Sequence, residues 1–167
     1  MAVKQLFQTL ADLIKQHQHL NQLAKDKMQA IKTEDLDTLT QLTKQENQTM
    51  QALRRTESER LKAITSLVME RKADLVPAEA TLEDLKPLIP AEHVEVLDTF
   101  QDKLVRELNA LQQQNELNQQ MLKDSLQFVH MSLDLIQPSP DDDINYSAPH
   151  EREAMPAEGY SMFDSKA

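Results

Sequence analysis

Apolar residues recur at steps of three and four over most of the chain, a pattern typical of helices packed side by side. The first such stretch covers about residues 3–31, and the second runs from residue 34 to about residue 73, with Thr33 as its predicted N-cap. The chain either reverses or bends near Lys32 and Thr33, and a reversal is favoured because neither helix can bury its apolar stripe alone. The predicted inward positions are Val3, Leu6, Leu10, Leu13, His17, Leu20 and Ala24 in the first helix, and Leu36, Leu39, Thr43, Glu46, Met50, Leu53, Glu57, Ile64 and Leu67 in the second.

Residues 74–90 interrupt this periodicity. Pro77 and Pro87 disfavour a continuous helix, so we predict an irregular connector with one short turn capped by Thr81 and Asp84. Pro90 suits the first turn of a third helix, about residues 91–137. At 1.5 Å per residue this helix is roughly 70 Å long. The predicted fold is therefore all-α: an elongated antiparallel helical bundle or coiled coil of three long helices, residues 1–137.

Residues 138–167 differ from the rest of the chain in charge. Half of the net charge of −10 lies here, because seven acidic residues are offset only by Arg152 and Lys166. A segment with this charge, four prolines and few aliphatic residues is predicted to be a flexible, disordered tail. Its large apolar side chains favour short linear motifs, with packing back onto the bundle as the alternative. They are Ile144, Tyr146, Met155, Tyr160, Met162 and Phe163.

Composition narrows the class of function. The chain has no cysteine, no tryptophan and one glycine, which suits long helices better than sheets. Its acidity disfavours nucleic acid and anionic membranes as partners, so a protein partner is expected. No run of 18 apolar residues exists, and no signal-peptide pattern opens the sequence. We therefore expect a soluble cytoplasmic protein without direct membrane insertion.

The residues that usually carry catalysis or bind metals do not form a pattern here. His17 and His19 are two apart, so on a helix they point about 200° apart and cannot share a metal ion. The sequence contains no glycine-rich phosphate loop and no cysteine nucleophile. We predict that the protein is not an enzyme and that it uses no metal and no cofactor.

Asn115 and Asn118 occupy successive inward positions of the third helix, where a coiled coil usually has leucine. In one interpretation they are core amides bonded to Glu46 or Glu57 of the second helix. In the other they line a docking groove and bond to an incoming helix. Apolar residues also flank the seam at Met121, Leu126, Phe128 and Met131, which indicates that something else covers this half of the helix. The inward positions are Leu97, Phe100, Leu104, Leu108, Leu111, Asn115, Asn118, Leu122, Ser125, Val129, Ser132 and Ile136.

Three segments carry a resemblance to a known family. They are NELNQQMLKDSLQFVHMSLDLI at 115–136, INYS at 144–147 and the terminal MFDSKA. They resemble the flagellar export chaperones of the FlgN family in the form found in Bacillus-type bacteria. The paired asparagines, three residues apart, are that family's most recognisable feature. The order of elements is similar over the whole chain: two N-terminal helices, a variable middle, a long third helix and a tail with tyrosine.

This resemblance implies a function. Members of the family bind the hook-associated proteins of the hook–filament junction, their clients, in the cytoplasm. They cover the client's C-terminal amphipathic helix, which prevents premature assembly, and deliver the client to the cytoplasmic domain of the flagellar type III export gate. The implied client-binding residues are Leu111, Asn115, Asn118, Met121, Leu122, Ser125, Leu126, Phe128, Val129 and Ser132, and the implied gate-binding residues are Ile144, Asn145 and Tyr146.

The alternative function is that of a structural or adaptor coiled-coil protein without chaperone activity. A strong obligate coiled coil has Leu, Ile or Val at most seam positions. Here polar residues such as His17, Thr43 and Ser125 dilute the seam. We therefore predict a monomer or weak homodimer that awaits a partner.

Overall fold

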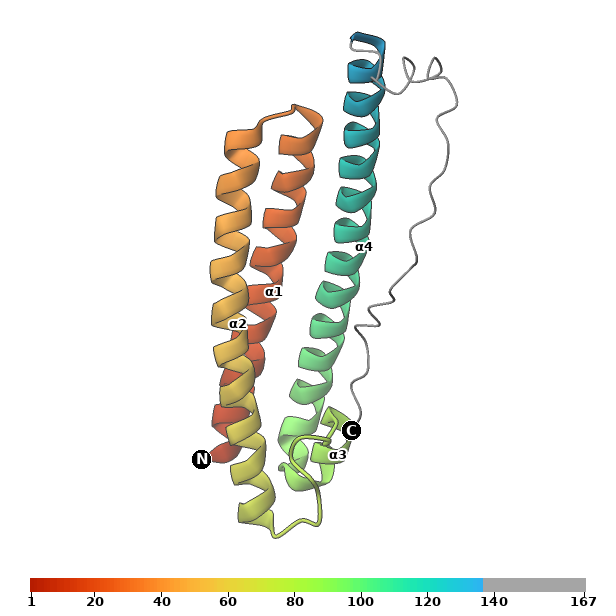
Figure 1. Ribbon diagram of the computed structural model, residues 1–167. Helices are drawn as coiled ribbons and strands as arrows, with labels where there is room; N and C mark the ends of the chain where they lie inside the picture. The colour runs from red at the N-terminus through yellow and green to blue at the C-terminus, as the bar shows by residue number, and fades with distance from the viewer. Residues whose placement is uncertain (137–167) are drawn as a thin grey trace, which may run out of the picture. The chain divides into compact units, whose positions relative to one another are not determined.

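Residues 1–136 are described by a computed structural model, and residues 137–167 lie outside that description. Every regular element in the described part is helical (Figure 1): α1 Ala2–Lys32, α2 Leu36–Arg71, α3 Leu82–Leu85, the 3-10 helix η1 Lys86–Leu88 and α4 Ala91–Ile136. The predicted all-α class is confirmed. The three long helices of the prediction correspond to α1, α2 and α4, and the connector contains α3 and η1 where one short turn was predicted. The predicted flexible tail falls outside the described residues.

The chain divides into two compact units, Met1–Phe128 and Val129–Ala167. The first unit contains α1, α2, α3, η1 and α4 as far as Phe128. The described part of the second unit is the end of α4, residues 129–136. The packing described below is that of the first unit.

The turn between α1 and α2 reverses the chain, as predicted, and does so without glycine. Glu34 adopts a φ of 54°, in the left-handed region. Its N–H donates to Ile31 O at 3.2 Å, and the N–H of Asp35 donates to Ala30 O at 2.9 Å. This pair of bonds is a Schellman motif, which satisfies the last carbonyls of a helix while the chain turns. The turn brings α2 back along α1, and the two helices pack against each other.

The predicted N-cap of α2 was wrong by two residues. Thr33 still belongs to the end of α1, because its hydroxyl donates to Gln29 O at 3.0 Å. Asp35 is the N-cap, and its carboxylate accepts from the N–H of Thr38 at 3.0 Å and from the Thr38 hydroxyl at 2.7 Å. These two bonds hold the pKa of Asp35 below its usual value. Thr33 and Asp35 are both good capping residues, so the sequence alone did not separate them.

One apolar core joins the N-terminal half of α1, the C-terminal half of α2, the connector and the start of α4. This core is called the base below. Burying one of its leucines contributes about 1.5–3 kcal/mol relative to leaving it exposed. The rings of Phe7, His93 and Phe100 pack beside it, with centroids 5.8 Å apart for Phe7–His93 and 5.7 Å for Phe7–Phe100. The buried residues of the base are Ala2, Leu6, Leu10, Leu13, Ala63, Ile64, Leu67, Val68, Leu85, Ile89 and Leu97.

The connector is tied to the base by polar contacts as well as by Leu85 and Ile89. Thr81 and Asp84 form the predicted capping box at the start of α3. Lys86 bonds to Glu83 and to Asp98 of α4, each at 2.7 Å. The hydrogen bond to Asp98 is the main reason that the pKa of Lys86 is raised above its usual value, and the bond to Glu83 is the second. These contacts hold the connector against the start of α4.

Some predicted inward positions are exposed. Leu36 is the first residue of α2 and precedes Leu39 and Leu42, which pack with Leu23 and Ala30 of α1. Leu108 is also exposed, although Leu104 and Leu111 are half-buried. A straight helix with 3.6 residues per turn drifts away from a strict heptad, which moves Leu108 to the side of α4.

Candidate protein-docking surface

Beyond the base, α4 is attached to α1 by amide side chains. Asn21 of α1 donates to the carbonyl oxygen of Glu107 at 3.0 Å and to its carboxylate at 2.6 Å. One helical turn further along α1, the Asn118 amide donates to Ala24 O at 2.7 Å. Gln114 donates to the Asn118 side-chain oxygen at 3.1 Å and contacts the sulfur of Met28 at 3.2 Å. Asn21, Gln114 and Asn118, with these partners, are called the amide seam.

The amide seam distinguishes between the two interpretations of Asn115 and Asn118, as core amides or as the lining of a docking groove. Asn118 is 4 % exposed and hydrogen-bonded, so the core-amide interpretation is confirmed for this residue. Its predicted partners, Glu46 or Glu57, were wrong: the acceptor is a main-chain carbonyl of α1. A carbonyl oxygen has two lone pairs, so Ala24 can accept this bond without leaving the helix. Asn115 is only half-buried.

Glu46 and Glu57 are paired with basic residues instead. The carboxylate of Glu46 accepts from Lys27 of α1 at 2.7 Å, and the two side chains are 24 % and 17 % exposed. Glu57 accepts from Arg60, one turn along α2, at 2.9 Å. Lys27 therefore links α1 to α2 at the level where Asn118 links α1 to α4.

Two pockets flank α4 along the seam. One, of about 180 Å³, lies among all three long helices and is lined by Lys27, Glu46, Asn115, Asn118, Gln119 and Leu122. The other, of about 490 Å³, lies between α1 and α4 and is lined by Asn21, Lys25, Glu107, Ala110, Gln113, Gln114 and Leu117. The sequence analysis did not select the α1 residues of either pocket. The signal that could have found them was the amide-rich run from Gln112 to Gln120, because amides on opposite sides of one helix predict polar contacts on both.

The predicted client-binding residues fall into three groups by burial. Asn118 is buried, whereas Leu111, Asn115, Met121 and Ser132 are half-buried. Leu122, Ser125, Leu126, Phe128 and Val129 are exposed, and Leu126 is 60 % exposed. Single exposed leucines are ordinary, but a run of them along one helix marks an interaction surface. The predicted gate-binding residues Ile144, Asn145 and Tyr146 lie outside the described residues.

The end of α4 adds apolar residues that the predicted set omitted. Met131, Leu133, Leu135 and Ile136 are all exposed large hydrophobic residues. Their signal was present in the sequence as an apolar residue at nearly every second or third position after Leu126. The heptad count left out Met131, Leu133 and Leu135 because they lie to the side of the predicted inward stripe.

No metal-binding cluster accompanies this surface in residues 1–136. Nowhere in that range do three His, Cys, Asp or Glu side chains gather as a metal site would require. Among the same residues, no helix combines the length and apolar character needed to cross a membrane. That the protein is not an enzyme stays a prediction.

Comparisons with known proteins identify the family of the chain. The family model described as FlgN protein matches residues 1–153. A similar protein from Bacillus subtilis (strain 168), named Uncharacterized protein YvyG, is 27 % identical over 167 residues, which is the full length of both chains. No solved structure matches the chain significantly. The chain belongs to the FlgN family, and membership of this family indicates a flagellar export chaperone.

Proposed function

We propose that the protein is a cytoplasmic chaperone of the flagellar type III export system. It binds the C-terminal helix of hook-associated junction proteins, prevents their premature assembly and delivers them to the export gate. The observation that carries this proposal is the run of exposed apolar side chains on α4 after Asn118, of which Leu122 and Leu126 lie in the first unit. A client helix that covers them removes apolar surface from water, at about 25 cal/mol per Å².

The proposed client-binding residues are those predicted from the sequence, with different roles. Leu122, Leu126 and Val129 supply apolar contact, because their side chains are exposed. Asn115 offers an amide at the edge of this surface. Asn118 acts indirectly by holding α4 on α1 through Ala24, so its loss would change how the surface is presented.

Titration of purified junction protein into the full chain tests the client surface. Leu126→Asp should weaken binding by about 10–100-fold, because a charge then replaces an apolar contact. Leu36→Asp is the matched control, since Leu36 is equally an exposed leucine but lies at the start of α2. Equal weakening by both variants, or by neither, would exclude α4 as the client surface.

Delivery to the gate is tested separately through Tyr146. A tyrosine combines a large apolar ring with one hydroxyl, which suits an interface anchor. Tyr146→Ala should leave client affinity unchanged and reduce binding of the client-loaded chaperone to the gate's cytoplasmic domain. Secretion of junction proteins should fall as well. Unchanged affinity for the gate would remove Tyr146 from the mechanism.

A further inference from the structure

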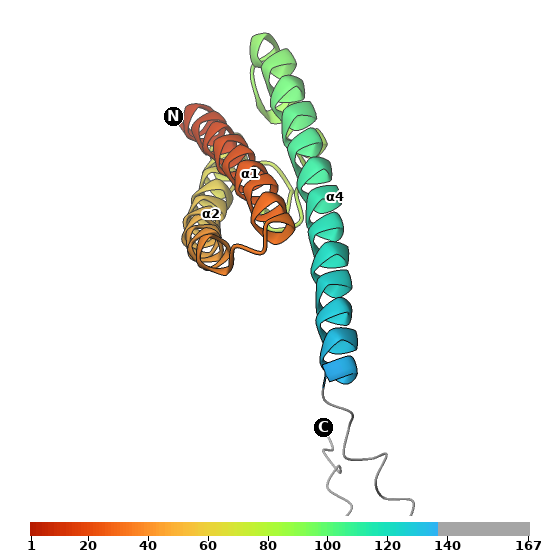
Figure 2. The same ribbon diagram turned by 90° about the horizontal axis from the view of Figure 1, so that it is seen from above.

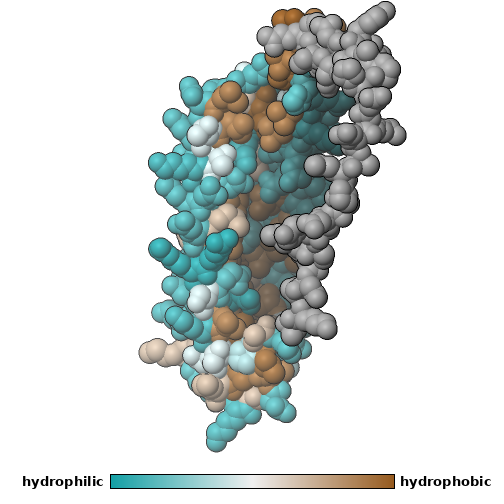
Figure 3. All heavy atoms as spheres, viewed as in Figure 1, coloured by the Kyte–Doolittle hydropathy of each residue, from teal (hydrophilic) through white to brown (hydrophobic). Residues whose placement is uncertain are grey.

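A furrow runs between α2 and α4 in the first unit, with α1 at its floor. In two perpendicular views α1 lies between the other two long helices (Figures 1 and 2). The pocket lined by Lys27, Glu46, Asn115 and Leu122 shows that the three helices leave space between them at the level of the seam. Apolar side chains gather in a recessed line between α2 and α4 (Figure 3).

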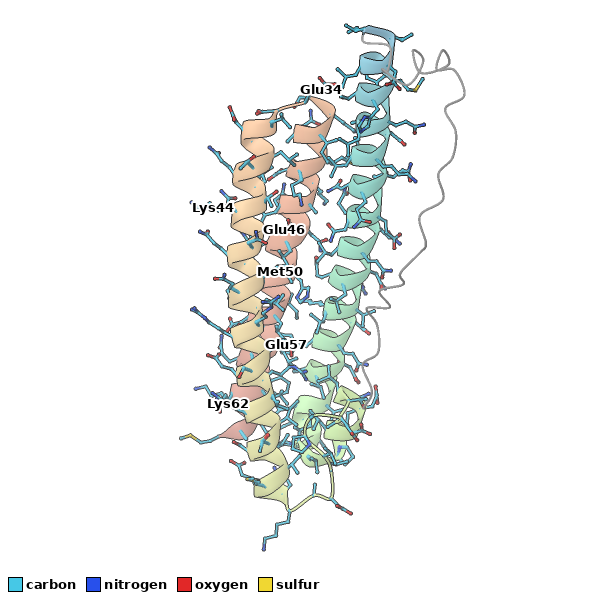
Figure 4. All side chains as sticks on the ribbon, viewed as in Figure 1. Glu34, Lys44, Glu46, Met50, Glu57 and Lys62 are labelled. Carbon is cyan, nitrogen blue, oxygen red and sulfur yellow. The ribbon has the colours of Figure 1, made fainter. Side chains whose placement is uncertain are left out.

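The α2 wall of the furrow presents side chains spaced three and four residues apart. Glu46, Met50 and Glu57 point from α2 toward α4, whereas Lys44 and Lys62 point away (Figure 4). Met50 is 38 % exposed although it is one of the predicted inward positions of α2. An apolar side chain that faces inward but stays exposed indicates that no neighbouring helix covers this side of α2.

The α4 wall of the furrow is formed by uncharged side chains. Leu108, Asn115 and Leu122 are seven residues apart, so they lie along one side of α4. Leu108 and Leu122 are both exposed hydrophobic residues. Leu122 also belongs to the proposed client surface, so the furrow continues directly from that surface.

The charges near the furrow already have partners. Glu46 is bonded to Lys27, and Glu57 is bonded to Arg60. A partner that turned a charged side chain into the furrow would lose its hydration without gaining a free counter-ion. The complementary partner therefore has an inward face of apolar residues, with amide or hydroxyl side chains for Asn115.

We propose that the furrow binds one amphipathic helix of such a partner in the position of the fourth helix of a bundle. This inference rests on the proposed function, and the occupant is the C-terminal helix of the junction protein. Four helices can enclose a core that three leave open, because each contributes one apolar stripe. The furrow extends the client site from α4 onto Met50 of α2 and Lys27 of α1.

The first test is a photo-crosslink from the full chain to the purified junction protein. A benzophenone amino acid at Met50 should crosslink to the client's C-terminal helix. The same amino acid at Lys44, on the outer side of α2, should not. A crosslink from Met50 only to a second copy of the chain would overturn the proposal, as would equal crosslinking from both positions or no client crosslink from Met50.

The second test compares two identical substitutions on α2. Met50→Glu should weaken client binding about tenfold or more, because it places an additional charge in the furrow. Met69→Glu should change it less than about twofold, because Met69 is 72 % exposed and its position on α2 is about 100° around the helix from Met50. Circular dichroism should show equal helicity in the two variants, and the crosslink at Met50 provides an independent reading if Met50→Glu unfolds.

The outcomes separate this proposal from the proposed function. If the wild-type chain binds the client and Leu126→Asp weakens binding, while Met50→Glu matches Met69→Glu, the chaperone function stands and the furrow is wrong. If the wild-type chain binds no junction protein, the proposed function fails and so does the occupant of the furrow.

Discussion

At the base of the first unit, α1, α2 and α4 meet through wholly buried leucines, whereas along the amide seam α1 meets α4 through side-chain amides. Leu6, Leu67 and Leu97 are each 0 % exposed. In the amide seam, by contrast, Asn21 of α1 is bonded to Glu107 of α4, and Asn118 of α4 is bonded to Ala24 of α1. The same helices therefore use two kinds of contact along their length.

This difference separates stability from recognition. Apolar burial contributes more free energy than the amide bonds and has no preferred direction, so most of the stability of the helix packing is expected to come from the base. A buried hydrogen bond adds only about 1 kcal/mol net, but it requires one particular geometry. The amide seam therefore sets the position of α4 on α1 while it contributes little to the free energy of unfolding. It also places polar groups beside the exposed leucines of α4. The predictions below test this contrast, from the largest expected effect to the smallest.

Truncating a leucine of the base should have the largest effect. Leu97→Ala should lower the free energy of unfolding by about 2–5 kcal/mol, because it leaves a cavity in a closed core. Leu108→Ala on the same helix is the matched control, and since Leu108 is exposed its effect should stay within about 0.5 kcal/mol. Urea unfolding followed by circular dichroism measures both. Similar losses in the two variants would remove the distinction between the base and the rest of α4.

Removing the seam amide should have an intermediate effect. Asn118→Ala should cost about 1–2 kcal/mol, because it deletes a buried bond to α1. Hydrogen exchange should become faster in residues 107–122 and stay unchanged in residues 91–104, which lie at the base. Asn109→Ala, at an exposed position of α4, should alter neither quantity. Faster exchange throughout α4 would show that the seam and the base unfold together.

The ion pair between α1 and α2 should contribute less. Glu46→Gln should cost about 0.5–1 kcal/mol, because Lys27 and Glu46 are only partly shielded from solvent. Lys44→Gln, on the outer side of α2, should be nearly neutral. The difference between the two variants should shrink in 1 M salt, where charges are screened over about 3 Å. A cost that is independent of salt would indicate loss of packing rather than of charge.

The smallest effect concerns the helix caps and appears only at low pH. Bonds from the hydroxyl and then the N–H of Thr81 lower the pKa of Asp84, as bonds from Thr38 lower that of Asp35. A lowered pKa in the folded state contributes stability above the unfolded value of about 3.9, and this contribution is lost as pH falls through the folded pKa. Urea midpoints between pH 7 and pH 2 should therefore fall less steeply for Asp84→Asn than for the wild type. Asp102→Asn, at an exposed position of α4, should follow the wild-type curve.

Periodicity in the sequence was enough to predict the helices and most of the base. Leu6, Leu10 and Leu13 recur at steps of three and four, and a helix translates that spacing directly into one face. The prolines of residues 74–90 marked the connector, and Thr81 with Asp84 marked its cap. These features are local, because each depends on residues within one or two turns of one another.

The tertiary structure alone decided which groups meet across helices. The sequence placed Asn118 inward, but its acceptor is the main-chain oxygen of Ala24, and every residue carries such an oxygen regardless of its type. Lys27 was not selected at all, because a lysine on an amphipathic helix is normally solvated until another helix brings a carboxylate to it. Side-chain spacing specifies a face, whereas the partner of an amide or a lysine depends on how far apart and at what rotation two helices pack.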